Sequence, residues 1–186
     1  MNSGQKPAWD IGCGCLISYA RTISHAMTMS FGSQMQVRDF LLPRHVLTDL
    51  RATDKVGVLQ ELSRRAGAAL NISSEIVSAA LLKREQLGST GMGNGIAIPH
   101  ACVAEVKEPF GMKARLKEPV DFEAVDEQPV DLVFLLLVPE PSQSRQINVL
   151  ASVARKLRDP KVRQELRTAK DARSIYRLMA EDAPRF

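Results

Sequence analysis

Cysteines, aromatic residues and long hydrophobic runs are all scarce in this sequence of 186 residues. Three cysteines, Cys13, Cys15 and Cys102, cannot form a paired disulfide framework, so we expect a reducing, cytoplasmic compartment. Cys13 and Cys15 form a lone C-x-C without a histidine at ligand spacing, so the sequence predicts no metal site. No apolar stretch approaches the roughly 20 residues that cross a bilayer, and we expect no membrane insertion.

A strong charge of one sign is also missing. The formal net charge is +4, and Lys and Arg alternate with Asp and Glu along the chain with few aromatic residues among them. A nucleic-acid-binding protein would need a clustered basic stripe or a recognition motif, and the sequence has neither. We therefore interpret the charges as solvated helix faces and expect no nucleic-acid partner.

The first 35 residues differ from the rest because they show no sustained periodicity. Residues 11–20 weakly resemble the apolar part of a secretory signal, but Asp10 adjoins them and no small-residue cleavage pattern follows. We expect residues 1–35 to be a disordered or non-native extension and residues 36–182 to form the domain. Three later methionines are plausible starts of a shorter natural product: Met27, Met29 and Met35.

Hydrophobic periodicity predicts strands and helices from residue 36 onward. The expected strands are 45–52, 95–100, 110–120 and 129–140. The expected helices are 53–70, 144–159, 160–169 and 171–182, and a further helix that follows Ser73 and Ser74 and includes Leu87. The apolar run from Leu132 to Val138 suits a strand buried on both faces, which requires helices above and below a sheet. Because strands and helices do not alternate cleanly, we predict a single-domain α/β sandwich with a central mixed β-sheet flanked by helices.

Capping residues support several of these helix boundaries. Thr53 or Asp54 can cap the first helix, Pro160 suits the first turn of another, and Asp171 can cap the last. The inward face of helix 144–159 is expected to carry Ile147, Leu150, Val153 and Leu157.

The stretch GSTGMGNG, residues 88–95, is a glycine-rich loop. Glycines admit positive φ, and successive backbone amides in such a loop form a concavity that favours anions. The known nucleotide-binding loops do not match, since Asn94 and Gly95 stand where a P-loop has Lys and Ser or Thr. No G-x-G-x-x-G pattern can be drawn either, because Ile96 occupies the place of its last glycine. The loop predicts a phosphate site of another kind.

His100 follows this loop and is the candidate nucleophile. Pro99 fixes its own φ and pushes Ile98 toward extended geometry, so the backbone that presents His100 is stiff. A neutral imidazole is abundant near pH 7 and attacks phosphorus well, and phosphoryl transfer needs little beyond positioning and hydrogen-bond donors. Candidate donors to the phosphoryl oxygens are Arg84, Ser89, Thr90, Gly93, Asn94 and Gly95. A glycine turn before a purely structural histidine is also common, so spacing alone leaves both interpretations open.

Three segments then carry a family resemblance: GSTGMGNGIAIPHA, PVDFEAVDEQPVDLVFLLLVPE and LASVARKLRDP. Together they resemble the enzyme IIA domains of the bacterial phosphotransferase system, in the fructose/mannitol class, and most closely the nitrogen-regulatory members. The resemblance covers about residues 36–182. It implies a single α/β domain that carries a phosphoryl group on Nε2 of His100, without a cofactor.

The same resemblance implies a donor and some site residues. The donor would be a phosphohistidine on an HPr-type carrier, which an enzyme I charges from phosphoenolpyruvate. Arg84 matches the arginine of the family's K-R-E run, which is thought to hold the phosphoryl group, and Ser89 and Thr90 match polar loop positions. Many relatives have a second histidine where this chain has Gln146, whose amide can donate a hydrogen bond but cannot titrate. An exposed helix residue is the alternative interpretation of Gln146.

The remaining candidates are interpreted as structural. His25 and His45 are expected at the surface, and Cys102 is expected to be a small buried residue, although it lies two positions after His100.

Three functional hypotheses remain. The first is a regulatory phosphocarrier whose phosphorylation state governs targets such as potassium transporters or sensor kinases, and the absence of a fused membrane segment or second carrier domain favours it. The second is a sugar-specific component that passes phosphate to a separate IIB protein. The third is a binding module that has lost transfer.

Overall fold

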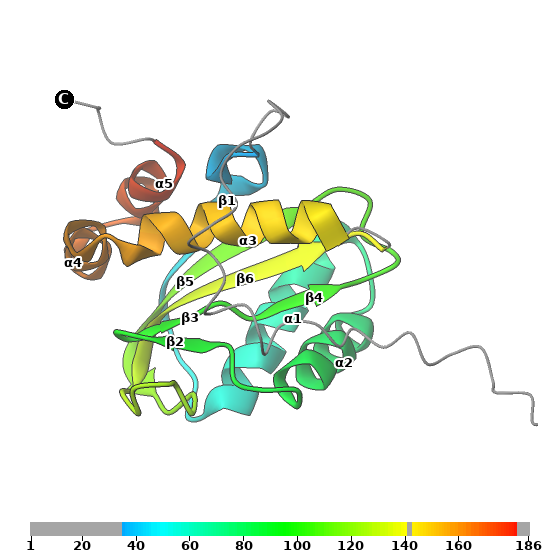
Figure 1. Cartoon of the computed structure of the whole chain (residues 1–186), viewed down its shortest axis with the longest axis horizontal. Helices are drawn as coiled ribbons and strands as arrows, with labels where there is room; N and C mark the ends of the chain where they lie inside the picture. The colour runs from blue at the N-terminus through cyan, green and yellow to red at the C-terminus, as the bar shows by residue number, and fades with distance from the viewer. Residues whose placement is uncertain (1–34, 141–142, 182–186) are drawn as a thin grey trace, which may run out of the picture. The chain divides into compact units, whose positions relative to one another are not determined.

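Six strands form one mixed sheet at the centre of the computed structural model, which describes residues 35–140 and 143–181 (Figure 1). The strands are β1 Leu41–Leu50, β2 Gly91–Gly93, β3 Ile96–Ala97, β4 His100–Cys102, β5 Phe110–Val120 and β6 Val130–Val138. Their order is β1-β5-β6-β3-β2, and β4 also pairs with β6. The β5–β6 and β2–β3 pairs are antiparallel, whereas β1–β5, β3–β6 and β4–β6 are parallel.

Helices cover both faces of this sheet (Figure 1). One layer contains α1 Lys55–Leu70 and α2 Ser74–Glu85, and the other contains α3 Gln143–Arg158, α4 Pro160–Thr168 and α5 Ala172–Ala180. Each layer has its own apolar core against the sheet. The predicted α/β fold with a mixed sheet between helices is therefore confirmed.

The central strand β6 shows why two layers are needed. Residues Leu132 to Leu137 are each 0% exposed. Val133, Leu135 and Leu137 pack toward α1 and α2, while Leu132 and the other even-numbered residues pack toward α3, α4 and α5. The expectation of a strand buried on both faces holds.

Side-chain caps mark the helix starts. Asp54 accepts a hydrogen bond from the amide of Gly57 at 2.7 Å, and Asp171 accepts one from Ser174 at 2.7 Å. Asp159 caps α4, which begins at Pro160. These local signals explain why the helix starts could be predicted within a few residues.

The strands near the glycine loop differ from the prediction. Residues 95–100 do not form one strand, because Pro99 has no amide hydrogen to donate and separates β3 from β4. The loop itself contains β2, which pairs with β3 as a hairpin. Strand β1 begins at Leu41 rather than residue 45, since an edge strand tolerates Pro43.

Two expectations about burial were wrong. His45 is 6% exposed rather than a surface residue, because its ring packs against Phe110 of the neighbouring strand β5, with ring centroids 4.6 Å apart. Ile147 is 45% exposed rather than inward, because Gln146 and Val149 take the core-facing side of α3.

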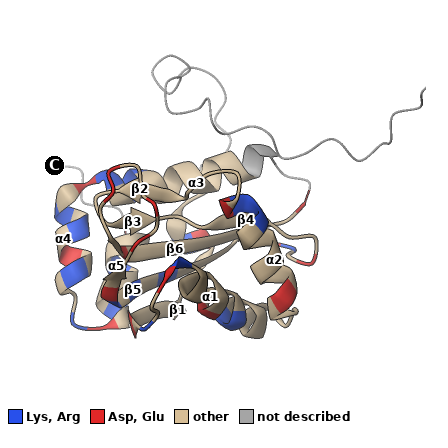
Figure 2. Cartoon of the chain, turned by 90° about the horizontal axis from the view of Figure 1, so that it is seen from below, with Lys and Arg blue, Asp and Glu red and all other residues tan. Residues whose placement is uncertain are grey.

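Residues 1–34 lie outside the described part of the chain. The predictions about most of the N-terminal extension, Cys13, Cys15, His25, Met27 and Met29 fall there. Within residues 35–140 and 143–181, charged side chains of both signs occur along α1 and α4 (Figure 2). None of the helices in these ranges is long and apolar enough to cross a membrane.

Candidate functional site

His100 begins β4, the short strand that follows Pro99 and pairs with β6 at Leu136. The residue is 6% exposed. Its Nδ1 lies 2.8 Å from the carbonyl oxygen of Ile98. Because a carbonyl can only accept a hydrogen bond, Nδ1 carries the proton and Nε2 carries the lone pair. The backbone before the strand thus selects one tautomer of the imidazole.

Arg84, in the last turn of α2, lies against the other ring nitrogen. Its Nε donates to Nε2 of His100 at 3.1 Å, and its Nη1 donates to the carbonyl of Gly88 at 2.9 Å. The second bond ties the guanidinium to the start of the glycine loop. A charged donor is therefore held beside the one ring nitrogen that has a lone pair.

Burial lowers the pKa of His100 to about 4. The hydrogen bond with Ile98 and the charge of Glu85 oppose this shift, while the charge of Arg84 adds to it. The ring is neutral at pH 7, which is the form that can act as a nucleophile.

Glu85 lies next to Arg84 in the chain and binds the same loop two residues further on, at Thr90. Its carboxylate accepts hydrogen bonds from the amide of Thr90 at 3.0 Å and from the hydroxyl of Thr90 at 2.7 Å. Lys55 of α1 forms an ion pair with the same carboxylate at 3.2 Å. The hydroxyl of Thr90 is therefore committed to Glu85 in this structure.

Ser89 is also engaged by its own surroundings. Its hydroxyl donates to the carbonyl of Phe122 and accepts from the amide of Gly91 at 3.0 Å. The bond to Phe122 attaches the loop to the segment after β5, and the bond from Gly91 lies within the loop. Any contact of Ser89 with a phosphoryl group stays a prediction.

The structure does not bring Gly93, Asn94 and Gly95 to His100. Asn94 and Gly95 form the turn of the β2–β3 hairpin and Gly93 ends β2 next to it. His100 instead follows the opposite end of the hairpin, where the amide of Ile98 donates to the carbonyl of Thr90 at 3.0 Å. The turn has its own partners, since the amide of Asn94 donates to Asp126 at 2.7 Å. The sequence reasoning could not tell which end of the hairpin faces the imidazole.

Gln146 lies on the α3 side of the site and is 8% exposed. Its Oε1 accepts a hydrogen bond from Sγ of Cys102 at 3.4 Å. Cys102 and His100 are two positions apart on β4, so their side chains point to the same face of the sheet. Gln146 is thus a buried neighbour of the strand that carries His100 rather than an exposed helix residue, and Cys102 is only partly buried.

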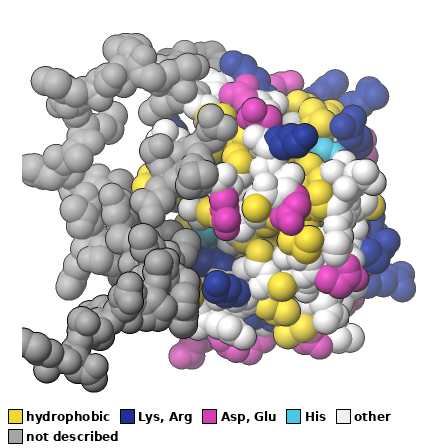
Figure 3. All heavy atoms as spheres, turned by 90° about the vertical axis from the view of Figure 1, so that its right-hand side faces the viewer, with side chains coloured by type: hydrophobic (Ala, Val, Ile, Leu, Met, Phe, Trp, Pro, Cys, Tyr) yellow, Lys and Arg dark blue, Asp and Glu magenta, His cyan; other side chains and the backbone are white. Residues whose placement is uncertain are grey.

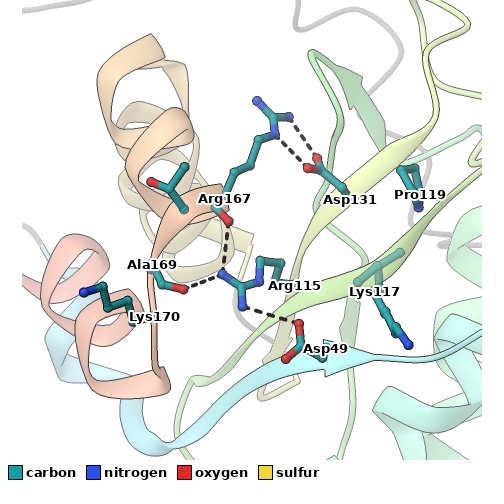
Figure 4. Close-up of a pocket in the computed structure, with 10 residues that line it drawn as sticks. Asp49, Arg115, Lys117, Pro119, Asp131, Arg167, Ala169 and Lys170 are labelled. Carbon is teal, nitrogen blue, oxygen red and sulfur yellow. Dashed lines mark hydrogen bonds and ion pairs between the residues drawn. The ribbon is translucent and has the colours of Figure 1, made fainter.

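A cavity of about 530 Å³ lies elsewhere, lined by residues that include Arg115 and Arg167 (Figure 4). Arg167 forms two bonds with Asp131, at 2.7 and 2.9 Å, and donates to the carbonyl of Asn94 at 2.7 Å. Arg115 donates to the carbonyls of Arg167 and Ala169, at 3.1 and 2.6 Å. These bonds connect α4 with the sheet and the hairpin turn.

Within residues 35–140 and 143–181, no group of three or more His, Cys, Asp or Glu side chains is placed so that it could hold a metal ion.

His100 is therefore a neutral, buried imidazole on an α/β scaffold, with a guanidinium against the nitrogen that carries its lone pair. The family model described as "Phosphoenolpyruvate-dependent sugar phosphotransferase system, EIIA 2" matches residues 39–182. The chain belongs to this family.

Curated relatives agree with this assignment. The chain is 42% identical over 146 residues to a nitrogen regulatory protein of Bradyrhizobium diazoefficiens, covering 78% of this chain and 95% of the relative. It is 37% identical over 150 residues to a nitrogen regulatory protein of Klebsiella oxytoca, covering 80% and 93%.

Solved structures are similar as well. The crystal structure of the nitrogen regulatory protein IIA-Ntr of Neisseria meningitidis matches with a TM-score of 0.74 and 34% identity, covering 77% of this chain and 98% of that one. The mannitol IIA of Escherichia coli has the same fold, with a TM-score of 0.66, 22% identity and coverage of 75% and 99%.

Some residues of the site were not anticipated from the sequence. Glu85 and Lys55 were missed because their contact joins two helices 30 positions apart, which periodicity cannot reveal. An acidic residue three positions before the glycine-rich loop was the available signal. The contact between Cys102 and Gln146 had no such signal.

Proposed function

We propose that this chain is a nitrogen-regulatory phosphocarrier that accepts a phosphoryl group on Nε2 of His100. The donor in this proposal is an HPr-type phosphohistidine in the cytoplasm. The observation that carries the proposal is the polarised imidazole: Nδ1 donates to Ile98 at 2.8 Å and Nε2 lies 3.1 Å from Nε of Arg84. The nitrogen-regulatory relatives support the regulatory part.

The transfer step needs only these groups. The lone pair of Nε2 attacks the phosphorus of the donor, a nitrogen–phosphorus bond forms on His100, and the bond to the donor imidazole breaks. Arg84, now on Nε2, would move onto an oxygen of the incoming phosphoryl group and offset its charge. The proton on Nδ1 of His100 stays in its bond to Ile98.

A protein donor also requires a surface around the imidazole. Leu87 follows the helix of Arg84 and is 53% exposed, and Ile147 follows Gln146 and is 45% exposed. The side of the molecule with α2 and β4 shows hydrophobic side chains among charged ones (Figures 1 and 3). Exposed apolar side chains beside a polar site favour docking of another protein.

The direct test is to incubate the protein with phosphoenolpyruvate, an enzyme I and a nitrogen-branch HPr. We expect an acid-labile gain of one phosphoryl group that peptide mapping places on His100, and no gain for His100→Ala. A confirmed donor that fails to label the wild-type chain would contradict the proposal and favour a binding module that has lost transfer.

A sugar-specific role is the second candidate. A solved complex of the mannitol IIA of Escherichia coli with phosphorylated IIB has a TM-score of 0.64 to this chain, at 22% identity. In that complex, a protein with the same fold as this chain contacts a IIB partner. Adding purified IIB proteins to the phosphorylated chain would distinguish the roles, since a regulatory carrier is expected to keep its label.

The regulatory role predicts that each phosphorylation state binds different targets, such as potassium transporters or sensor kinases. A phosphoryl group adds roughly two negative charges beside a surface that partners touch. Pull-down with wild-type protein and His100→Ala, under conditions that charge the donor, would test whether binding depends on phosphorylation.

A further inference from the structure

Glu85 is a buried carboxylate to which the transfer step above assigns no task. It is 8% exposed and directly follows Arg84 at the end of α2. Both of its oxygens accept hydrogen bonds from Thr90, one from the amide and one from the hydroxyl. Two bonds to a single residue hold the backbone of Thr90 in place as well as its side chain.

A continuous series of hydrogen bonds leads from this carboxylate to the imidazole. The carbonyl of Thr90 accepts from the amide of Ile98 at 3.0 Å. The carbonyl of Ile98 in turn accepts from Nδ1 of His100 at 2.8 Å. The position of the Ile98 carbonyl, which selects the tautomer, therefore depends on Thr90, and Thr90 depends on Glu85.

The charge of Glu85 is balanced on its far side. Lys55 lies 3.2 Å from Glu85 and 3.1 Å from Glu123. Burial opposes its charge, but the hydrogen bonds with Glu123 and Glu85 raise the pKa of Lys55, so the ammonium stays charged at pH 7. An ion-paired Glu85 repels an incoming phosphoryl group less than an unpaired carboxylate would.

We propose that Glu85 is a positioning residue that holds His100 in its Nδ1–H tautomer through Thr90 and Ile98. This inference rests on the proposed function of His100 as the phosphoryl acceptor. Glu85 itself does not touch the phosphoryl group. It ensures that the lone pair is on Nε2, next to Arg84, when the donor arrives.

Two substitutions weaken the hydrogen bonds between Glu85 and Thr90 without removing a large side chain. Glu85→Gln keeps the shape, but its amide nitrogen cannot accept a bond from Thr90. Thr90→Val removes only the hydroxyl bond and keeps the volume, and Thr90→Ser restores a hydroxyl. Glu61→Gln is the matched control, because Glu61 is an ion-paired glutamate on the surface of α1.

The first measurement is the pair of ¹⁵N chemical shifts of the His100 imidazole in the unphosphorylated proteins. We expect the Nε2–H tautomer to appear in Glu85→Gln and Thr90→Val, but not in Glu61→Gln. The second is the rate of phosphorylation by the charged donor. Loss of about one buried hydrogen bond predicts a rate about tenfold lower in Glu85→Gln, and Thr90→Ser is expected to be faster than Thr90→Val.

Circular dichroism and a thermal melt of each variant separate unfolding from mispositioning. Nitrogen shifts like those of the wild type in both folded variants, or a rate within twofold of wild type, would overturn the inference. A wild-type chain that is never phosphorylated would instead contradict the proposed function, and the tautomer measurement would still decide whether Glu85 positions the ring.

Discussion

His100 and Lys113 are two basic side chains on the central sheet that share deep burial and differ in their hydrogen-bond partners. His100 is 6% exposed and Lys113 is 0% exposed. Burial is the main cause that lowers the pKa of both, to about 4 for His100 and to about 7 for Lys113. A shifted pKa alone would mark both residues as candidates for chemistry.

Their hydrogen bonds distinguish them. The ring of His100 has a carbonyl on one nitrogen and a guanidinium on the other, which leaves one defined lone pair. The ammonium of Lys113 donates to the carbonyls of Ala114 and Val133, at 3.2 and 3.4 Å, within its own sheet. A lowered pKa therefore reports burial in both residues, whereas of the two only His100 has a lone pair in contact with a charged donor.

The largest effect is expected from removing the guanidinium. Arg84→Met should lower the rate of phosphorylation by the charged donor about 100- to 1,000-fold, because one charged donor to the transferring group is lost. Arg64→Met on α1, which breaks an exposed ion pair with Glu61, is the control and should leave the rate unchanged. If Arg84→Met lowered the phosphorylation rate less than threefold, the guanidinium on Nε2 would no longer distinguish His100 from Lys113.

The next effect is on stability as a function of pH. Folded His100 has a pKa of about 4 and the unfolded residue about 6.5, so only the unfolded state binds this proton between these values. The contribution of neutral His100 to the free energy of unfolding is complete above pH 6.5. It falls by about 3 kcal/mol as the pH drops from 6.5 through 4.

Urea unfolding of the wild type and His100→Ala, from pH 4 to 7.5, would measure this contribution. His45, whose pKa burial also lowers, is present in both proteins and cancels in the difference. Parallel curves for the two proteins would show that His100 is not held neutral by the fold.

Replacing Lys113, unlike replacing Arg84, should change stability and leave phosphorylation unchanged. Lys113→Met is expected to stabilise the protein by about 2 kcal/mol at pH 6.5, because a buried charge is replaced by an apolar side chain of similar volume. The gain should shrink between pH 7 and 10, where folded Lys113 loses its proton and the unfolded residue keeps it. Phosphorylation should be unaffected, and a slower transfer in this variant would assign Lys113 to the site after all.

The smallest effect is expected at Gln146. Its contact is one neutral hydrogen bond from Cys102 at 3.4 Å, so Gln146→Ala should change the transfer rate about threefold. Asn148→Ala, at an exposed position of the same helix, is the matched control. A loss of 100-fold in Gln146→Ala would mean that this amide contacts the phosphoryl group directly.

Much of the fold follows from local signals that a sequence displays. Asp54 and Asp171 precede their helices at capping positions, and the run from Leu132 to Val138 is long enough to indicate a fully buried strand. The hairpin of β2 and β3 could not be predicted, since its glycines have no hydrophobic periodicity. Burial of His45 depends on Phe110, which is distant in the chain, and no local pattern shows that pairing.

The candidate site also has features that local sequence signals indicate and features that depend on long-range contacts. The motif and the resemblance pointed to Arg84 and His100, and the structure brings these two side chains into contact. The orientation of the glycine hairpin is a long-range property, because Asp126 and Arg167 hold its turn. The sequence therefore indicates residue types that could bind an anion, but it does not show which backbone amides face the imidazole.

The bond between Nδ1 of His100 and the carbonyl of Ile98 also bears on reversibility. In the proposed function, an oxygen that can only accept favours a proton on Nδ1 both before and after Nε2 gains a phosphoryl group. A ring that keeps this proton is positively charged once phosphorylated, and it departs from phosphorus more readily than a neutral ring without the proton. One backbone oxygen would thus favour release of the phosphoryl group from His100 once the group has been accepted.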